Sequence, residues 1–371
     1  MKLSGTEYVE SLSPWPEEFG LDRIRALLAD LGDPQLRYPS IHVVGTNGKT
    51  TTARMIEALL EAEGLTVGAY TSPHVSGWAE RIRVGGEEAD FESAIERVRA
   101  AAEAAQATQF ELLTAAALAE FAEAGVDAAV VEAGLGGRYD ATNVLRSPVQ
   151  VLTNVALEHT EQLGATREEI AAEKLAVVEP GATVVLGEPE WEALARENGA
   201  GAVVVTGRSN IACAVAAAES FLGRPVDASP AQELELPGRQ LDRRGEEPLE
   251  IWDGAHNPNG VGYLLSRLPS RRYVVVCSIL ADKDAERMLG GLGALGDVFI
   301  ATQSTNSRTL PAEELARRAG SFFDTVEAVD DPVRARERAL ELAGPQGAVL
   351  ITGSLYVLAD LNASVRAGDV A

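Results

Sequence analysis

The sequence places a glycine-containing turn between a predicted strand and a predicted helix, Val43-Val44-Gly45-Thr46-Asn47-Gly48-Lys49-Thr50-Thr51-Thr52. Such a turn directs backbone N–H groups and the positive end of the helix at phosphate oxygens. The lysine then reaches the terminal phosphates, and a hydroxyl can bind Mg²⁺. Val43 stands where the common P-loop has its first glycine, so this is a shorter form of the motif. The ATP-binding candidates in it are Asn47, Gly48, Lys49, Thr50 and Thr51.

Short β-branched runs alternate with helical periodicity on both sides of this turn. Helices are expected at 49–63, 91–105 and 114–124, and a capping box, Thr166-x-x-Glu169, predicts another helix that runs to 178. Strands are expected at 41–44, 66–70, 126–132, 149–155, 183–186 and 202–206. This alternation predicts a mostly parallel sheet with helices on both faces, the α/β class.

The periodicity breaks at 236–248, where charge clusters, and we interpret this stretch as a linker. A second alternating series follows, with strands expected at 250–252, 273–277, 298–301, 325–328 and 348–352. We therefore expect a P-loop-type, mostly parallel domain over 1–238 and a smaller Rossmann-like α/β domain over 239–371.

Composition excludes several classes of protein. The net charge of −24 repels nucleic acid, so we expect no nucleic-acid partner. No stretch approaches the roughly 20 apolar residues that span a bilayer, and the first residues do not read as a secretion signal. We expect a cytoplasmic monomer with no membrane partner. Cys213 and Cys277 lie far apart in apolar surroundings, which predicts buried, unpaired thiols.

Lysine is rare, and it occurs only at Lys2, Lys49, Lys174 and Lys283. A lysine that persists where arginine has taken nearly all other positive charge is a candidate for a role that arginine cannot fill. Lys174 would lie inside the capping-box helix beside Glu173. The alternative is an exposed lysine that balances Glu169 or Glu173.

Polar side chains follow several predicted strands. Ser72, Glu132 and His159 come at or after the ends of strands of the front sheet, where ligands of parallel sheets collect. Alternatives are a capping or ion-paired role for Glu132 and a structural role for His159. Asp253 and His256 follow a strand of the rear domain, and Asp253 is also a plausible turn former.

The short turn, Gly-Thr-Asn-Gly-Lys, resembles that of the Mur ligase superfamily. Other segments narrow the resemblance to the folylpolyglutamate synthase/dihydrofolate synthase family. They occur in family order from about residue 18 to 355: Gly20-Leu21-Asp22-Arg23-Ile24, Thr71-Ser72-Pro73-His74, Phe110-Glu111-Leu112-Leu113-Thr114, Gly134-Leu135-Gly136-Gly137-Arg138-Tyr139-Asp140-Ala141-Thr142-Asn143 and Asp253-Gly254-Ala255-His256-Asn257-Pro258.

The resemblance implies an ATP- and Mg²⁺-dependent ligase that adds L-glutamate to dihydropteroate or folate through an acyl phosphate, and it leaves a monovalent cation open. It also implies residue roles: catalysis by Lys49, Lys174 and His256; ATP binding by the turn with Asn210, Arg239 and Asp253; metal binding by Ser72, Glu132, His159 and Lys174; and a folate side at Phe110, Glu111, Tyr139, Asp140 and Ala141. In the superfamily, the lysine matching Lys174 is often carbamylated and then helps to hold a second Mg²⁺.

The chain departs from the family pattern at two places. Thr50 stands where the family has glycine, so the hydroxyl that meets the metal is Thr50 or Thr51. Arg208-Ser209 stands where a His-Gln pair is usual near the adenine.

Two other functions were weighed. A muramyl-peptide ligase would need a domain ahead of the ATPase, for which the 44 residues before Gly45 leave no room. A non-catalytic ATP-binding partner protein would not need Lys49, Glu132, His159 and Lys174 together. The choice between dihydrofolate synthase, folylpolyglutamate synthase and both stays open.

Overall fold

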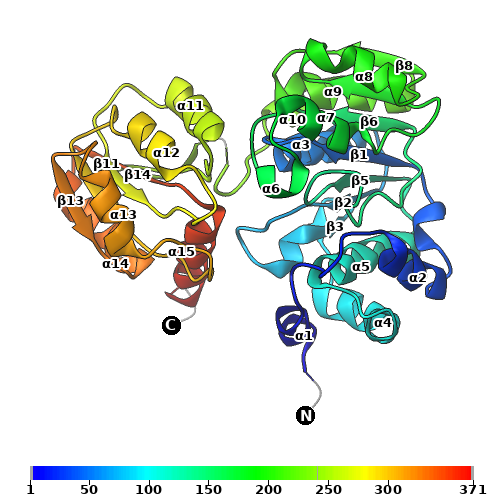
Figure 1. Cartoon of the computed structure of the whole chain (residues 1–371), viewed down its shortest axis with the longest axis horizontal. Coiled ribbons are helices and arrows are strands. Elements are labelled where there is room, and N and C mark those ends of the chain that lie inside the picture. The colour runs from blue at the N-terminus through cyan, green and yellow to red at the C-terminus, as the bar shows by residue number, and fades with distance from the viewer. Residues whose placement is uncertain (1–2, 240, 369–371) are drawn as a thin grey trace. The chain divides into compact units, whose positions relative to one another are not determined.

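The computed structural model describes residues 3–239 and 241–368, so that Lys2 lies outside the described residues (Figure 1). Its contacts divide the chain into two compact units. The first runs to Leu234 apart from His74–Gly77, and these four residues belong with the second unit, which resumes at Glu235. The domain boundary between 238 and 239 stays a prediction.

The first unit is built on a mostly parallel sheet with the strand order β4-β3-β2-β5-β1-β6-β7-β8. Only the β3–β2 and β4–β3 pairings are antiparallel among those described. The strands are β1 Ser40–Val44, β2 Val67–Tyr70, β3 Ile82–Val84, β4 Glu87–Glu88, β5 Ala128–Glu132, β6 Val149–Leu152, β7 Thr183–Leu186 and β8 Ala202–Val205.

Helices cover both faces of this sheet, because successive strand side chains point to opposite faces. In β5, Ala128 and Val130 pack toward α3, α9 and α10, whereas Ala129 and Val131 pack toward α1, α2, α4 and α5. Helices α7 and α8 cover the second face along β6 and β7. The helical segments are α1 Gly5–Ser11, α2 Asp22–Asp30, η1 Pro34–Leu36, α3 Lys49–Ala62, η2 Trp78–Arg81, α4 Phe91–Ala104, α5 Gln109–Ala124, α6 Thr160–Leu163, α7 Arg167–Leu175, η3 Pro189–Trp191, α8 Glu192–Glu197, α9 Asn210–Leu222 and α10 Ser229–Gln232.

The second unit also has a mostly parallel sheet, with the order β13-β12-β11-β14-β10-β9. Helices α11 to α13 pack on one face, and α14 and α15 pack on the other together with Val75 of the His74–Gly77 segment. The elements are β9 Asp242–Glu246, β10 Leu249–Trp252, α11 Pro258–Arg267, β11 Val274–Cys277, α12 Ala285–Leu292, β12 Val298–Ala301, α13 Ala312–Ala319, β13 Thr325–Ala328, α14 Pro332–Ala343, β14 Ala348–Thr352 and α15 Leu355–Gly368. The predicted fold class, two α/β parts with mostly parallel sheets, is confirmed.

The expected strands are all present, with ends shifted by a few residues, but the linker prediction is partly wrong. Residues 242–246 of the expected linker form β9, which pairs antiparallel with β10 at the sheet edge. Charged side chains suit an edge strand, because one side of it faces water. The same charged composition is typical of a linker, so the strand was not predicted from the sequence. Helix α5 starts at Gln109 instead of 114, behind a capping box formed by Thr108 and Glu111.

Two simpler expectations can be compared with the structure directly. Cys213 and Cys277 are buried free thiols, as predicted. Among the helices of the described ranges, none combines the length and the apolar character that crossing a membrane requires.

Candidate functional site

The phosphate-binding turn requires glycine at two positions. Gly45 has φ +148°, and a Cβ there would lie 1.9 Å from Thr153 Oγ1. Gly48 has φ +80° and caps α3, and a Cβ there would lie 2.4 Å from Asn210 Oδ1. Because both positions combine a positive φ with close neighbours, a side chain at either would displace the turn. The turn therefore leads directly into the N-terminus of α3, and a helix N-terminus is suited to binding anions.

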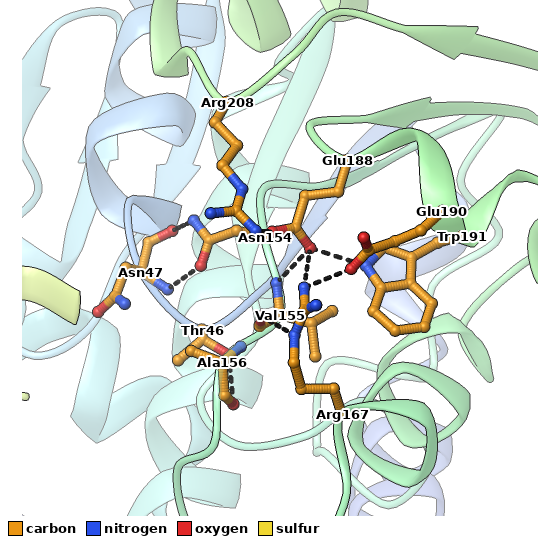
Figure 2. A network of polar contacts seen from close by, with 10 residues as sticks. All are labelled: Thr46, Asn47, Asn154, Val155, Ala156, Arg167, Glu188, Glu190, Trp191 and Arg208. Carbon is orange, nitrogen blue, oxygen red and sulfur yellow. Dashed lines mark hydrogen bonds and ion pairs between the residues drawn. The ribbon is translucent and has the colours of Figure 1, made fainter. Parts of the chain in front are cut away.

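The turn is held by the loop that follows β6 (Figure 2). Thr46 N donates to Asn154 O at 2.9 Å, and the Asn154 carboxamide accepts from Asn47 N at 3.1 Å and donates to Asn47 O at 2.8 Å. Thr153 Oγ1 donates to the same Asn47 carbonyl at 2.8 Å. Thr153 and Asn154 were not among the residues predicted from the sequence. The available signal was a pair of polar residues at the carboxyl end of a predicted strand.

A carboxylate lies at the start of α3. Glu132 ends β5 and is 1% exposed. Thr50 Oγ1 donates to its oxygens at 2.8 and 3.0 Å, and Ser72 N donates to Oε2 at 2.9 Å. The structure therefore brings together Thr50, Ser72 and Glu132, three residues that were predicted at separate points of the sequence. Of the two candidate hydroxyls, this geometry favours Thr50 over Thr51 as the one beside the carboxylate.

These residues fit a magnesium site. Mg²⁺ prefers oxygen ligands and commonly uses one or two carboxylates, with water and phosphate oxygens completing the shell. Within the described ranges, no group of three His, Cys, Asp or Glu side chains is arranged to hold a metal ion. Here a single carboxylate and a hydroxyl lie beside a phosphate-binding turn. This matches a Mg²⁺ site completed by water and phosphate oxygens, and it does not match a site made only of protein ligands. His159 lies on the loop after β6, where it caps α6 with φ 50°.

Lys174 lies against the phosphate-binding turn. It projects from α7, whose start is fixed by the predicted Thr166–Glu169 capping box, and it is 4% exposed. Its Nζ donates to Gly45 O at 2.9 Å. Burial, and next the positive charge of Lys49, lower the pKa of Lys174 to about 7. The alternative of an exposed lysine balancing Glu169 or Glu173 is therefore wrong.

Lys49 itself follows the turn and begins α3. Its Nζ donates to Thr46 O at 3.2 Å, so the side chain folds back over the turn. Two amines thus converge on one loop.

The predicted folate-side residues separate into two kinds. Phe110 packs against Tyr70 with ring centroids 6.0 Å apart, and its ring lies where a Cβ on Gly134 would be. Tyr139 is 52% exposed. Both aromatic side chains are suited to contact a flat ligand. Ala141 is buried, two residues after Tyr139 in the loop that follows β5.

The two acidic residues of that set are turned inward. Asp140 accepts hydrogen bonds from Leu135 N at 2.8 Å, Thr142 N at 3.0 Å and Thr142 Oγ1 at 2.5 Å, and burial raises its pKa. Glu111 caps α5 and pairs with Arg23 at 3.2 Å. These contacts show that Asp140 and Glu111 hold their loops in shape, and a contact of either residue with a folate stays a prediction.

A buried histidine supports the Asp140 loop from below. Thr142 Oγ1 donates to Asp140, and it therefore accepts from His42 Nε2, 2.8 Å away. Burial lowers the pKa of His42 to about 4, so the ring is neutral at pH 7. His42 lies in β1, and the sequence alone did not select it as a support for the loop.

The remaining ATP candidates lie in different units. Asn210 is the first residue of α9 in the first unit, and its carboxamide lies where it would clash with a Cβ on Gly48. Arg239, Asp253 and His256 belong to the second unit. Asp253 accepts from Leu241 N at 3.2 Å and Ala255 N at 3.0 Å, and burial raises its pKa against the opposing effect of these bonds and of Arg239. His256 Nδ1 lies 2.8 Å from Gly254 O, so Nδ1–H donates to that carbonyl.

Known families match both parts of the chain. Residues 43–221 match the Mur ligase middle domain, and residues 241–355 match the Mur ligase, glutamate ligase domain. A dihydrofolate synthase/folylpolyglutamate synthase of Mycobacterium tuberculosis is 33% identical in an alignment of 389 positions, gaps included, that covers 83% of this chain and 80% of the relative. One of Escherichia coli is 33% identical in an alignment of 403 positions, gaps included, that covers 96% of this chain and 93% of the relative.

Solved structures of similar proteins agree with these matches. M. tuberculosis folylpolyglutamate synthase complexed with ADP superposes with a TM-score of 0.89 at 30% identity, covering 97% of both chains. E. coli FolC in complex with DHPP and ADP gives a TM-score of 0.89 at 30% identity, covering 99% of both chains. The bifunctional synthase of Yersinia pestis with Mn, AMPPNP and L-glutamate bound gives 0.88 at 30% identity, covering 98% of both.

Proposed function

Because the chain belongs to the dihydrofolate synthase/folylpolyglutamate synthase family of Mur ligases, we propose that it joins L-glutamate to a dihydropteroate or folate carboxylate with the use of ATP. The observation that carries this proposal is the convergence of Lys49, Lys174 and the Thr50–Glu132 pair on one phosphate-binding turn. A protein that only bound nucleotide would not need a buried amine of lowered pKa there.

The proposed reaction has two steps. A carboxylate oxygen of the acceptor attacks the γ-phosphorus, the bond to the β–γ bridging oxygen breaks, and ADP leaves. The glutamate amine then attacks the carbonyl carbon of the acyl phosphate, the C–O bond to phosphate breaks, and the amine loses a proton. Inorganic phosphate and an amide result, so the atoms balance.

The residues of the turn stabilise charge in this scheme. In this proposal, backbone N–H groups at the start of α3 and the Lys49 ammonium would neutralise the transferring phosphoryl group, which is the main task of a protein in phosphoryl transfer. Glu132 and Thr50, with Ser72 and His159 as further candidates, would hold Mg²⁺, which would neutralise phosphate charge when bound. Lys174 is placed behind the turn, on the carbonyl of Gly45.

The acceptor and the amino acid are proposed from the relatives. The E. coli structure was solved with DHPP, and that of Y. pestis with L-glutamate. Phe110 and Tyr139 provide aromatic surface of the kind a pteridine ring stacks on. Asn210, Arg239 and Asp253 are proposed for ATP, and His256 for catalysis.

The cellular setting also stays a proposal. The charge of −24 supports small-molecule substrates over nucleic acid. A cytoplasmic location, a monomeric state and a monovalent cation remain predictions, and separation by size with light scattering would test the second.

One experiment tests the function directly. Purified protein should release phosphate only when ATP, Mg²⁺, L-glutamate and either dihydropteroate or a reduced folate are all present. Mass spectrometry of the products with each acceptor would separate dihydrofolate synthase from folylpolyglutamate synthase activity. If no amide forms with any pteroate or folate acceptor, the substrate assignment is wrong.

A further inference from the structure

A buried carboxylate connects the loops behind the phosphate-binding turn (Figure 2). Glu188 follows β7 and is 2% exposed. Its Oε2 accepts hydrogen bonds from Val155 N at 3.0 Å, Arg167 Nη2 at 3.0 Å and Trp191 Nε1 at 2.7 Å. A carboxylate buried to this extent is tolerated only with such partners, so the arrangement is built and not incidental.

Arg167 completes a closed ring with this carboxylate. Arg167 is the first residue of α7, and its Nε donates to Val155 O at 3.0 Å. The Glu188–Arg167 pair therefore holds both the N–H and the C=O of Val155. The fork geometry of the guanidinium makes this double contact possible, because Nε and Nη2 point to different acceptors.

The neighbours of Val155 carry the phosphate-binding turn. Asn154 makes hydrogen bonds with Thr46 and Asn47, and Ala156 N donates to Thr46 Oγ1 at 3.0 Å. A shift of Val155 would consequently displace both contacts of the turn. The two loops are too closely packed for a shift of Val155 to be absorbed by movement of Gly187. A Cβ on Gly187, beside Glu188, would lie 1.9 Å from Thr153 O.

We propose that Glu188 and Arg167 are positioning residues for nucleotide binding, which act through Val155 on Thr46 and Asn47. They do not touch the nucleotide in this scheme, and the inference rests on the proposed function only in that the turn binds ATP. Arg208 contributes less to holding Glu188. Its ion pair with Glu188 Oε1, at 2.5 Å, lacks hydrogen-bond alignment, and its side chain is 69% exposed.

Two conservative variants separate this role from general stabilisation. Glu188→Gln keeps the size and one acceptor but removes the charge that faces Arg167. Arg167→Lys keeps the charge, but a single ammonium cannot reproduce the fork that contacts both Val155 O and Glu188. The matched control is Arg196→Lys, because Arg196 forms an exposed pair with Glu192 within α8.

Binding of ADP with Mg²⁺, measured by calorimetry, is the first readout because it needs no acceptor. We expect about tenfold weaker binding in both variants, equivalent to about 1.4 kcal/mol, because each variant weakens the charge-assisted hydrogen bonds that hold Val155. KM for ATP should rise by a similar factor, while KM for glutamate and the binding by Arg196→Lys stay within about twofold of wild type.

Several results would overturn the inference. ADP affinity within twofold of wild type in both variants would do so, as would an equal loss in all KM values that tracks a lower melting temperature. If Glu188→Gln does not fold, Arg167→Lys decides, and failure of both to fold would make the pair purely structural. If the wild-type protein does not bind ADP, the proposed function is overturned as well. If the wild type binds ADP and both variants bind it equally well, only the inference about Glu188 and Arg167 is overturned.

Discussion

Replacement of Lys174 by arginine tests what the buried amine does. Lys174 Nζ lies 2.9 Å from Gly45 O, the side chain is 4% exposed, and its pKa is lowered to about 7. Arginine stays protonated at every relevant pH, so the variant places a permanent charge at this position. On the carbamate hypothesis, a neutral amine of Lys174 reacts with CO₂ and the resulting carboxylate helps to bind metal.

The lowered pKa sets the expected size of the effect. With a pKa of about 7, half of the Lys174 amines are neutral at pH 7. About one in eleven is neutral at pH 6 and about ten in eleven at pH 8, so the rate of carbamylation at a fixed CO₂ concentration should increase up to about tenfold over this range. The carbamate keeps one N–H, so the contact with Gly45 O can persist. Lys174→Arg should lose turnover by about 100-fold, the size seen when one preorganised stabiliser is removed.

The assay is phosphate release at saturating ATP and Mg²⁺ between pH 6 and 8, with and without bicarbonate. ADP binding by Lys174→Arg should persist and serves as the folding control. In ¹³C-bicarbonate, the wild type should show a carbamate signal that Lys174→Arg lacks. Short carboxylates should partly restore activity to Lys174→Ala, and the wild type with the same additives is the control. Normal kcat of Lys174→Arg at saturating Mg²⁺ would refute the carbamate hypothesis.

Three further outcomes are expected. Lys49→Ala should lower kcat by about 100-fold or more with nearly unchanged folding, and wild-type turnover would show that the turn is not the phosphate cradle. Thr50→Ala should raise the Mg²⁺ concentration for half-maximal activity more than Thr51→Ala does, because only Thr50 is seen to contact Glu132; the reverse order would reassign the hydroxyl. The buried neutral His42, with its pKa lowered to about 4, binds fewer protons folded than unfolded, so stability is full above about pH 6.5 and should fall by about 2 kcal/mol by pH 5. Urea unfolding at both pH values, compared with His42→Gln, checks this, and an equal loss in the variant would contradict it.

Much of the fold could be read from the sequence because the strands are buried on both faces. Runs such as 128–132 and 183–186 are short, apolar or β-branched, and alternate with helices, which leaves few arrangements. Strand β9 was not predicted from the sequence, because its charged residues form a strand only through pairing with β10 at the sheet edge. Local composition does not carry such pairing information.

The candidate site was predictable where chemistry is local and obscure where it depends on packing. The spacing of Gly45, Gly48 and Lys49 is enough to predict the phosphate-binding turn. The inward orientation of Asp140 and Glu111 depends on partners such as Leu135 N and Arg23, which sequence spacing does not reveal. Glu188 was overlooked for the same reason, because its importance comes from where Val155 lies.

The placement of Val75 has a practical consequence for dissecting the gene. Val75 is 1% exposed in the core that also contains Leu355 and Leu358, although it is encoded 160 codons before the second unit resumes at Glu235. An expression fragment that starts at Glu235 would therefore lack one wall of its own interior. Such a fragment should be soluble only when a peptide containing His74–Gly77 is grafted on or supplied separately, so truncation libraries of this gene need a discontinuous design.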